Sequence, residues 1–295
     1  MAGSRVLVAG ATGQLGRVVT RKLVAAGIPV RALARRPDRL AALGPDVETA
    51  AVDLLDLAGL TEACRGIDQI VATANNNMGK GPTSPSRTDL AAYQNLCAAA
   101  RTARVRRLIY VSFRGMRQDA PVDIFRIKWY IEDAIRRSGV PFVMLRPTAF
   151  MDIWIDEILA KGMREKGVAT IFGSGDNVGN YIAVDDVAEF AVRIAESSIT
   201  NEIVEAGGPS DVTMNQLTTL LERRLNKRVR RRHIPVVAMR LLPPIVRPFN
   251  EVAARMMTLG LYAATQPQAF PGWKASADRL GVSPQSVETY IETRF

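Results

Sequence analysis

The sequence predicts an α/β protein in which a parallel β-sheet is covered by helices on both faces. Short apolar runs alternate with helix-length amphipathic segments over the first half of the chain, and three glycines, Gly10, Gly13 and Gly16, join the first run to the first helix. Strands that alternate with helices need right-handed crossover connections, which make neighbouring strands parallel. A chain of 295 residues, 47% of them hydrophobic, is long enough to bury such a core.

The first strand and the first helix lie on either side of the glycine turn. Residues 5–9 form the apolar run, and Leu15, Val19 and Leu23 then recur at helical spacing up to Gly27, a residue type that commonly ends helices. Further strand-like runs occupy 29–34, 47–52, 69–72, 107–111 and 142–145. Helical patterns separate the later runs, at 90–103 and 124–138.

The alternation changes after Pro147. We expect a helix at 150–161, a glycine-rich stretch at 167–179, a helix at 184–197 and a late strand at 203–206. Thr213 and Gln216 have the spacing of a capping box for a helix running to residue 225, and Ser283 with Pro284 suggests the start of a last helix. The predicted architecture is a doubly wound, Rossmann-type domain over 1–150, completed by about 183–206, with a smaller C-terminal substrate lobe over 151–295.

The amino-acid composition limits the kinds of molecule that the chain is expected to bind. The net charge is +10, from 39 Lys and Arg against 29 Asp and Glu, but the basic clusters at 101–107 and 227–232 contain no stacking aromatic residues, so we expect no nucleic-acid partner. Two cysteines without metal-ligand spacing indicate no metal site and a reducing compartment. The first residues leave no room for a signal peptide, so we expect a cytoplasmic protein.

The most apolar region, residues 234–262, is interrupted by Arg and Pro and has no run long enough to span a bilayer. It is compatible with a lid over a substrate pocket or with peripheral membrane contact, and we favour the lid.

The turn from Gly10 to Gly16 carries the main functional prediction. Glycines at spacing three and three, directly after a strand and opening a helix, let the backbone approach phosphate groups while the helix amides face them. A simple strand-to-helix turn would need only one glycine. We therefore expect a dinucleotide pyrophosphate to bind at Gly10, Thr12, Gly13, Gln14, Leu15 and Gly16.

The second strand indicates which dinucleotide is bound. A site for NAD places Asp or Glu about 20 residues after the turn, but this chain has Arg35 and Arg36 there. A guanidinium can pair with the 2′-phosphate of NADP(H), so Arg35 is the predicted discriminator, with Arg36 or Arg31 as helpers. The alternative is a solvated loop of arginines.

The ends of the third and fourth strands complete the predicted cofactor site. Asp53 and Leu54 follow the third strand where adenine would lie, although capping of a turn is an equally good role for Asp53. Ala74 and Asn75 follow the fourth strand, and the segment 75–82 is expected either to border the nicotinamide or to form a polar mobile loop.

Several motifs resemble the atypical short-chain dehydrogenase/reductases. In chain order they are Gly10-Ala11-Thr12-Gly13-Gln14-Leu15-Gly16, Ala34-Arg35-Arg36-Pro37, Val52-Asp53-Leu54, Tyr110-Val111-Ser112, Ser138-Gly139-Val140-Pro141, Leu145-Arg146-Pro147-Thr148 and Val184-Asp185-Asp186-Val187-Ala188. The chain looks closest to the NmrA-like group, which includes NADPH quinone reductases, NADP(H)-sensing regulators and complex I accessory subunits. This resemblance implies NADP(H) as the cofactor.

The resemblance also implies a set of catalytic positions. In that superfamily a Ser ends the fifth strand, and a Tyr-x-x-x-Lys pair on the next helix donates a proton and holds the nicotinamide ribose. Ser112 and Lys128 match two of the three positions, but Ile124 occupies that of the Tyr. Tyr130 lies about 200° around the helix from Lys128 and so does not replace the missing hydroxyl.

We therefore predict an oxidoreductase that transfers hydride from NADPH to a quinone-like or other apolar carbonyl or enone acceptor. Lys128 is expected to bind the ribose, with a direct role as acid or plain surface charge as alternatives. The competing hypothesis is a non-catalytic NADP(H) sensor or assembly factor that lacks the catalytic Tyr. Phe150, Met151 and Trp154 could form an apolar substrate wall or belong to a core, and His233 is expected to be structural.

Overall fold

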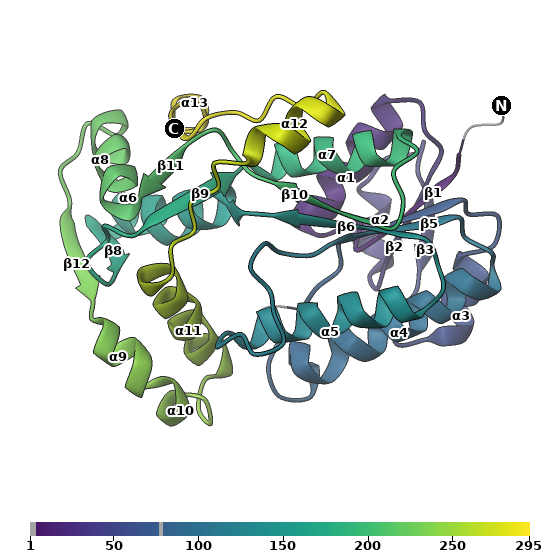
Figure 1. Cartoon of the computed structure of the whole chain (residues 1–295), viewed down its shortest axis with the longest axis horizontal. Helices are drawn as coiled ribbons and strands as arrows, with labels where there is room; N and C mark the ends of the chain where they lie inside the picture. The colour runs from purple at the N-terminus through teal and green to yellow at the C-terminus, as the bar shows by residue number, and fades with distance from the viewer. Residues whose placement is uncertain (1–3, 77–78) are drawn as a thin grey trace. The chain divides into compact units, whose positions relative to one another are not determined.

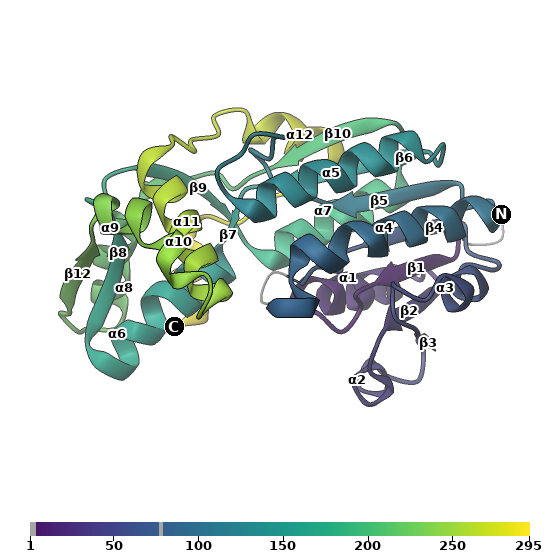
Figure 2. The same cartoon turned by 90° about the horizontal axis from the view of Figure 1, so that it is seen from below.

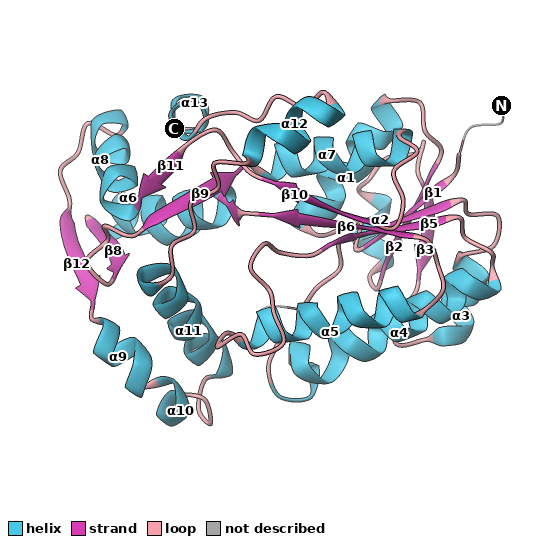
Figure 3. Cartoon of the chain, in the orientation of Figure 1, coloured by secondary structure: helices cyan, strands magenta, loops and turns pink. Residues whose placement is uncertain are grey.

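The computed structural model describes residues 4–76 and 79–295. Its main feature is a seven-stranded sheet with the strand order β10-β6-β5-β4-β1-β2-β3, seen nearly edge-on in Figure 1 and coloured magenta in Figure 3. The strands are β1 (Val6–Ala9), β2 (Val30–Ala34), β3 (Glu48–Ala51), β4 (Gln69–Ala72), β5 (Arg107–Val111), β6 (Phe142–Pro147) and β10 (Glu202–Ala206). The pairs from β3 through β6 are parallel, as predicted.

The winding order reverses between β1 and β4. The chain builds β1, β2 and β3 in one direction, then returns to place β4 on the other side of β1. Ala9 is in register with Leu33 and with Ala72, so these three strands end at nearly the same level. In open α/β sheets, ligands bind at the carboxyl ends of the strands beside such a reversal.

Helices cover both faces of this sheet. Figures 1 and 2 show α3, α4 and α5 on one face and α1 and α7 on the other. The bounds of these five helices, and of the short helices α2 and η1 between them, are α1 (Gln14–Ala25), α2 (Pro37–Ala41), α3 (Leu57–Ala63), η1 (Gly81–Thr83), α4 (Pro85–Thr102), α5 (Asp123–Arg137) and α7 (Val184–Glu196). The predicted doubly wound α/β fold is confirmed.

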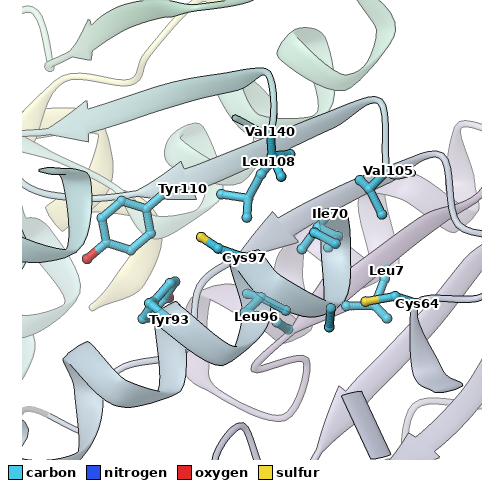
Figure 4. Packing of buried hydrophobic residues seen from close by; sticks show 14 of the residues in the cluster. Leu7, Cys64, Ile70, Tyr93, Leu96, Cys97, Val105, Leu108, Tyr110 and Val140 are labelled. Carbon is cyan, nitrogen blue, oxygen red and sulfur yellow. The ribbon is translucent and has the colours of Figure 1, made fainter. Parts of the chain in front are cut away.

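The core beneath α4 is apolar and closely packed. Figure 4 shows Leu7, Ile70 and Leu108, from three neighbouring strands, beside Leu96 and Cys97 of α4. These strands are buried on both faces, and every second residue of each one points toward α4. The other cysteine, Cys64, is also buried, and burial raises the pKa of both thiols to about 11, which keeps them protonated at neutral pH.

The chain divides into two compact units. Unit 1 contains Met1–Arg146, Val187–Glu205 and Leu280–Val282, and therefore holds the seven-stranded sheet almost entirely. Unit 2 contains Pro147–Asp186, Ala206–Arg279 and Ser283–Phe295. Each unit is formed by separate stretches of sequence, because the chain leaves unit 1 after β6 and returns to it for most of α7 and β10.

Unit 2 has two small sheets, β11-β9-β7 and β12-β8, surrounded by helices. Its strands are β7 (Ala149–Phe150), β8 (Val168–Phe172), β9 (Val178–Ile182), β11 (Asp211–Thr213) and β12 (Arg230–Ile234). Its helices are η2 (Asp152–Ala160), α6 (Lys161–Lys166), α8 (Met214–Arg224), α9 (Val236–Leu241), α10 (Pro243–Val246), α11 (Glu251–Thr265), α12 (Trp273–Leu280) and α13 (Val287–Arg294). No helix in the two described stretches is both long and apolar enough to cross a bilayer.

Helix capping follows the sequence at one site and departs from it at another. The Thr213–Gln216 capping box is present, with both of its reciprocal hydrogen bonds. The predicted start of the last helix at Ser283 is wrong, because α13 begins at Val287 and Ser286 is its N-cap, accepting a hydrogen bond from the amide of Thr289. A serine caps a helix only where its side chain can accept a hydrogen bond from the N3 amide. Ser283 and Ser286 are the same residue type, but only Ser286 stands at that position.

Candidate functional site

The glycine turn is tightly packed against the end of β4. Gly10 has a φ of +89°, and a Cβ placed on it would lie 2.7 Å from the amide nitrogen of Ala74. A Cβ on Gly16 would overlap the carbonyl oxygen of Gly10 and lie 2.8 Å from Oγ1 of Thr73. These two positions therefore admit only glycine, since any side chain would push the turn off the sheet.

The third glycine faces outward. Gly13 is exposed, and it is the N-cap of α1 without any side-chain hydrogen bond to the helix amides. The first amides of a helix have no partner within the helix, and the first turn of α1 has no acidic residue to compete for them. Arg17 donates to the carbonyl oxygen of Thr12 at 3.4 Å, which places a guanidinium beside the turn. The turn thus presents the positive end of α1 to an anion.

The arginines at the end of β2 differ in what they contact. Arg35 is exposed and its guanidinium makes no hydrogen bond or ion pair within the described ranges 4–76 and 79–295. Arg36 pairs with Asp38 at 2.8 Å. Arg31 binds Glu48 and the backbone of α3, so it is held within unit 1 at the amino end of β2. Of these three side chains, Arg35 is the one available for a phosphate.

The next two predicted contacts also lie at the carboxyl ends of strands. Asp53 follows β3 and accepts a hydrogen bond from the amide of Leu55 at 2.9 Å, so its turn-capping role is realised in the structure. Leu54 is half-buried beside it. Ala74 packs against Gly10, and its carbonyl accepts a hydrogen bond from the hydroxyl of Tyr93 at 2.7 Å.

The segment after β4 is only partly described. Asn75 is exposed, and its side-chain amide donates to the carbonyl of Thr73 at 3.3 Å. Asn76 donates its backbone amide to Asp89 of α4 at 3.1 Å. Asn77 and Met78, which belong to the predicted loop over 75–82, lie outside the described residues.

Ser112 and Lys128 come together at the end of β5. Lys128, on α5, donates from Nζ to the carbonyl oxygen of Val111 at 3.3 Å, which brings its ammonium next to Ser112 along the chain. The Ser112 side chain is buried, and its Oγ has no hydrogen-bond partner within the described part of the chain. Buried hydroxyls are nearly always hydrogen-bonded, so this one is a candidate for contact with a bound molecule.

The surroundings of Lys128 shift the pKa of its amine. Its Nζ lies 5.3 Å from the ring centroid of Tyr110, over the face of the ring. Burial lowers the pKa of Lys128 to about 8, while the negative charges of Asp89 and Glu132 act in the opposite direction. At neutral pH the amine is largely protonated yet close to its pKa, a state suited to holding and releasing a proton.

The missing Tyr hydroxyl is not replaced on α5. Ile124 is buried in the first turn of this helix, and Tyr130 is exposed, with its ring against Trp129. The prediction that Tyr130 does not take over the role therefore agrees with its position. The polar residues that do surround Lys128, namely Asp89 and Glu132, were not singled out from the sequence; both are buried acids on helices, a signal that becomes readable only once their burial is known.

Other sequence candidates have structural roles. Met151 and Trp154 are buried in the core of unit 2, where the Trp154 ring meets Phe172 and Tyr181 edge to face. Their core interpretation is thus the one the structure supports. His233 lies on β12 with Nδ1 2.8 Å from the carbonyl oxygen of Gly173. Among the described residues, no group of three or more His, Cys, Asp or Glu side chains could hold a metal ion.

The geometry fits a nicotinamide dinucleotide: two glycines packed against the sheet, the amides at the start of α1, and a buried Ser112 hydroxyl next along the chain to the carbonyl that a half-buried Lys128 contacts. Residues 10–198 match the model of a protein family described as NAD(P)H-binding. The chain belongs to this NAD(P)H-binding family. The matched family agrees with the resemblance drawn from the sequence motifs, and the predicted cofactor is confirmed at the level of NAD(P)H.

Named relatives share most of the chain. A (4-alkanoyl-5-oxo-2,5-dihydrofuran-3-yl)methyl phosphate reductase from Streptomyces griseus is 34% identical over 270 residues, covering 89% of this chain and 90% of its own. An NAD(P)H azoreductase from Xenophilus azovorans is 27% identical over 227 residues, with coverages of 76% and 75%. The NADPH complex of a quinone oxidoreductase from Escherichia coli has a TM-score of 0.82 at 21% identity, covering 98% and 99% of the two chains.

Proposed function

We propose that this family member is an NADPH-dependent oxidoreductase that reduces a conjugated apolar acceptor, such as a quinone or an unsaturated carbonyl compound, in the cytoplasm. The two relatives described above by sequence are reductases, which favours an enzyme over a non-catalytic sensor. The single observation that supports the acceptor class is that Ser112 and Lys128 both lie at the end of β5, while Ile124 stands where the superfamily has its Tyr.

The cofactor half of the proposal depends on the turn and on Arg35. The amides at the start of α1 would bind the pyrophosphate, and Arg35, which has no competing partner among the described residues, would bind a 2′-phosphate. The bound nicotinamide supplies the hydride. Lys128 would bind the ribose hydroxyls, and the position of its Nζ at the end of β5 supports this role.

The acceptor half depends on proton supply. A positioned general acid contributes about 10²- to 10⁴-fold in rate to a reaction that needs one. Saturated ketones need it, because a localised alkoxide is a poor product in the absence of a proton donor. A conjugated acceptor spreads the charge over several atoms and can take its proton later from water. Ser112 would orient the acceptor oxygen, and the Lys128 ammonium would be a nearby proton donor.

This class of acceptor suits the names of the relatives. One is named for an alkanoyl-substituted dihydrofuranone, another for azo compounds, and the structural neighbour for quinones. All three contain a conjugated system, and none is a simple saturated ketone. We carry over this shared chemistry to the present chain, not any one of the three substrates.

Steady-state oxidation of NADPH with a panel of acceptors tests the proposal. We expect turnover with naphthoquinones and with unsaturated lactones, and rates about 10²- to 10⁴-fold lower with saturated ketones. The Ser112→Ala variant should lose activity while retaining affinity for NADPH. Tight NADPH binding without turnover of any acceptor would identify a sensor instead, and equal rates with saturated ketones would refute the acceptor class.

A further inference from the structure

An exposed apolar surface lies on α9, α10 and the turn after them. Phe249 is 89% exposed, and Val237, Leu241 and Ile245 are 65%, 61% and 63% exposed. With Leu242, five large hydrophobic residues are exposed within 13 positions, 237–249, which we call the apolar patch. Large apolar side chains scattered singly on a surface need no explanation, but a cluster of this kind marks an interaction site.

The patch is presented by a firmly held support. Met239 of α9 belongs to the core of unit 2 and Pro243 of α10 is buried, so one side of this short helical segment is anchored while the opposite side faces out. Val237 and Leu241 are one helical turn apart on α9, on the side away from Met239. Contacts with α11 hold both α9 and α10 in place, and Figure 1 shows the three helices together after β12.

The surroundings of the patch are cationic. Residues 223–249 contain nine Arg and Lys and no Asp or Glu, which is close to the whole net charge of +10. Arg240, inside the patch, and Arg230 and Arg232, on the adjoining strand β12, are exposed. The segment therefore combines protruding hydrophobic side chains with a dense positive charge.

We propose that the apolar patch binds the surface of an anionic lipid bilayer, with its hydrophobic side chains inserted and its arginines at the headgroups. Amphipathic segments of this composition lie in the interface, with the apolar side about 5–10 Å deep and the cations paired with anionic lipids. The patch is too short to span the bilayer, so the contact is peripheral. This goes beyond the proposed reductase activity and does not depend on it.

A second copy of the chain and a nucleic acid both fit the apolar patch and its arginines less well than an anionic bilayer does. A second copy of the chain, docked symmetrically through the patch, would bring the same cationic segment against itself, and like charges oppose that contact. A nucleic acid would satisfy the arginines, but it gives no role to Val237, Leu241 and Ile245, because single strands stack on aromatic rings. An anionic bilayer would bind both features of the surface, because its hydrocarbon accepts the hydrophobic side chains and its headgroups pair with the arginines.

Flotation of the full chain with lipid vesicles, without cofactor or acceptor, tests the proposal. We expect co-flotation with vesicles of phosphatidylcholine mixed with phosphatidylglycerol, little with phosphatidylcholine alone, and loss at high ionic strength. Phe249→Ser should weaken binding about tenfold or more, since one apolar side chain fully transferred from water is worth at least that factor. Ile203→Ser is the matched control: Ile203 is also exposed, but Glu202 and Glu205 are its neighbours in β10.

Arg240→Glu should weaken binding to the anionic vesicles in the same assay. Near-equal thermal unfolding of the variants and the parent protein would show that each has folded, because the substituted side chains are exposed. The parent protein remaining at the bottom of the gradient at low salt would overturn the proposal. So would binding that Arg240→Glu abolishes and Phe249→Ser leaves intact, which indicates general attraction to polyanions.

Two further results would replace the lipid with another occupant. If Phe249→Ser raises KM for a water-soluble acceptor and leaves flotation unchanged, the patch is a lid on the substrate site. If it instead abolishes a concentration-dependent dimer in the absence of lipid, the patch is an interface between copies. Failure of the reductase assay has no bearing on the flotation result, so the two proposals fail separately.

Discussion

Arg35 is the side chain on which the choice between the two dinucleotides depends. It ends β2, is exposed and lacks a partner within the described residues, whereas Arg36 and Arg31 already contact acidic groups. We expect Arg35→Asp to weaken NADPH binding about 10- to 100-fold, because hydrogen bonds to charged groups contribute about 1.5–3 kcal/mol. NADH affinity should change little or improve. Fluorescence titration with both dinucleotides measures the ratio.

Arg65→Asp is the control for this substitution. Arg65 is an exposed arginine after α3, before the amino end of β4, and it pairs with Glu62 at 3.1 Å. Its replacement should leave the ratio of the two affinities unchanged. An unaltered ratio in the Arg35→Asp variant would contradict the assignment of Arg35.

The lowered pKa of Lys128 predicts how kcat/KM depends on pH. Burial lowers its pKa from the ordinary value of 10.5 to about 8, so the ammonium is present below pH 8 and is lost as the pH rises above it. If the protonated amine supports the reaction, kcat/KM falls above pH 8 by up to about tenfold per pH unit. Lys128→Arg should remove this fall, because a guanidinium stays protonated throughout the range.

Lys128→Met supplies the complementary measurement. It removes the charge at every pH, so kcat/KM should be lower and flat across the same interval. A fall near pH 8 that persisted in the Lys128→Met variant would belong to another group. Both profiles are obtained from initial rates with one quinone at several pH values.

The residue-level site could be predicted where a motif fixes both type and spacing. The glycines and Arg35 follow from short patterns, whereas Ser112 and Lys128 were implied by the resemblance to the atypical short-chain dehydrogenase/reductases. All of them lie at the carboxyl ends of strands of one sheet or, for Lys128, in contact with such an end. Asp89 and Glu132 could not be found in this way. Each is an acid on an amphipathic helix, where a polar residue normally faces water. Their burial depends on tertiary partners: Glu132 pairs with Arg146 of β6, and Asp89 accepts a hydrogen bond from the amide of Asn76.

At the scale of the element, α1 and its turn act as one anion-binding device. Gly16 allows the first turn of α1 to lie against Gly10, and a methyl group there would overlap the Gly10 carbonyl. We expect Gly16→Ala to shift the turn, to destabilise the protein by about 1–3 kcal/mol as overpacked sites do, and to weaken NADPH binding at least tenfold. Urea denaturation and NADPH titration measure the two effects.

Gly272→Ala makes the same chemical change where there is room. A Cβ at Gly272 would meet only the ring of Phe270, at 3.4 Å, an ordinary van der Waals distance. Its stability and its NADPH affinity should match those of the parent protein. If Gly16→Ala were equally harmless, the close packing of the turn would have no functional meaning.

Elements with a local signal were predictable and those that depend on distant partners were not. The strands at 69–72 and 107–111 match β4 and β5, because buried parallel strands are continuous apolar runs. Strand β12 has the sequence Arg230-Arg231-Arg232-His233-Ile234 and no strand signal of its own. It forms because β8, some 60 residues earlier, supplies its hydrogen bonds in parallel register. Tertiary pairing of that kind overrides local propensity.

At the scale of the whole molecule, the sheet of unit 1 is completed by a late stretch of chain. Most of α7 and β10 belong to unit 1, although unit 2 has begun before them. Arg107 in β5 secures this return. Its guanidinium donates to Gln69 in β4 and to the carbonyl oxygens of Ala195, Ser197 and Ile199 at the end of α7. A cation at the carboxyl end of a helix is also favoured by the helix dipole.

Arg107→Met should therefore destabilise the folded protein strongly. Arg107 is buried, and its removal leaves the side chain of Gln69 and several carbonyl oxygens without their donor, a loss of about 3–5 kcal/mol for a broken buried network of charged hydrogen bonds. Arg106→Met is the matched control, since Arg106 is an exposed neighbour that pairs with Asp68 at 3.1 Å and should contribute less than about 1 kcal/mol. Urea denaturation gives both free energies of unfolding. Equal free energies of unfolding for the two variants would mean that apolar packing alone holds α7 and β10 in unit 1, and that the hydrogen bonds of Arg107 are not needed for this.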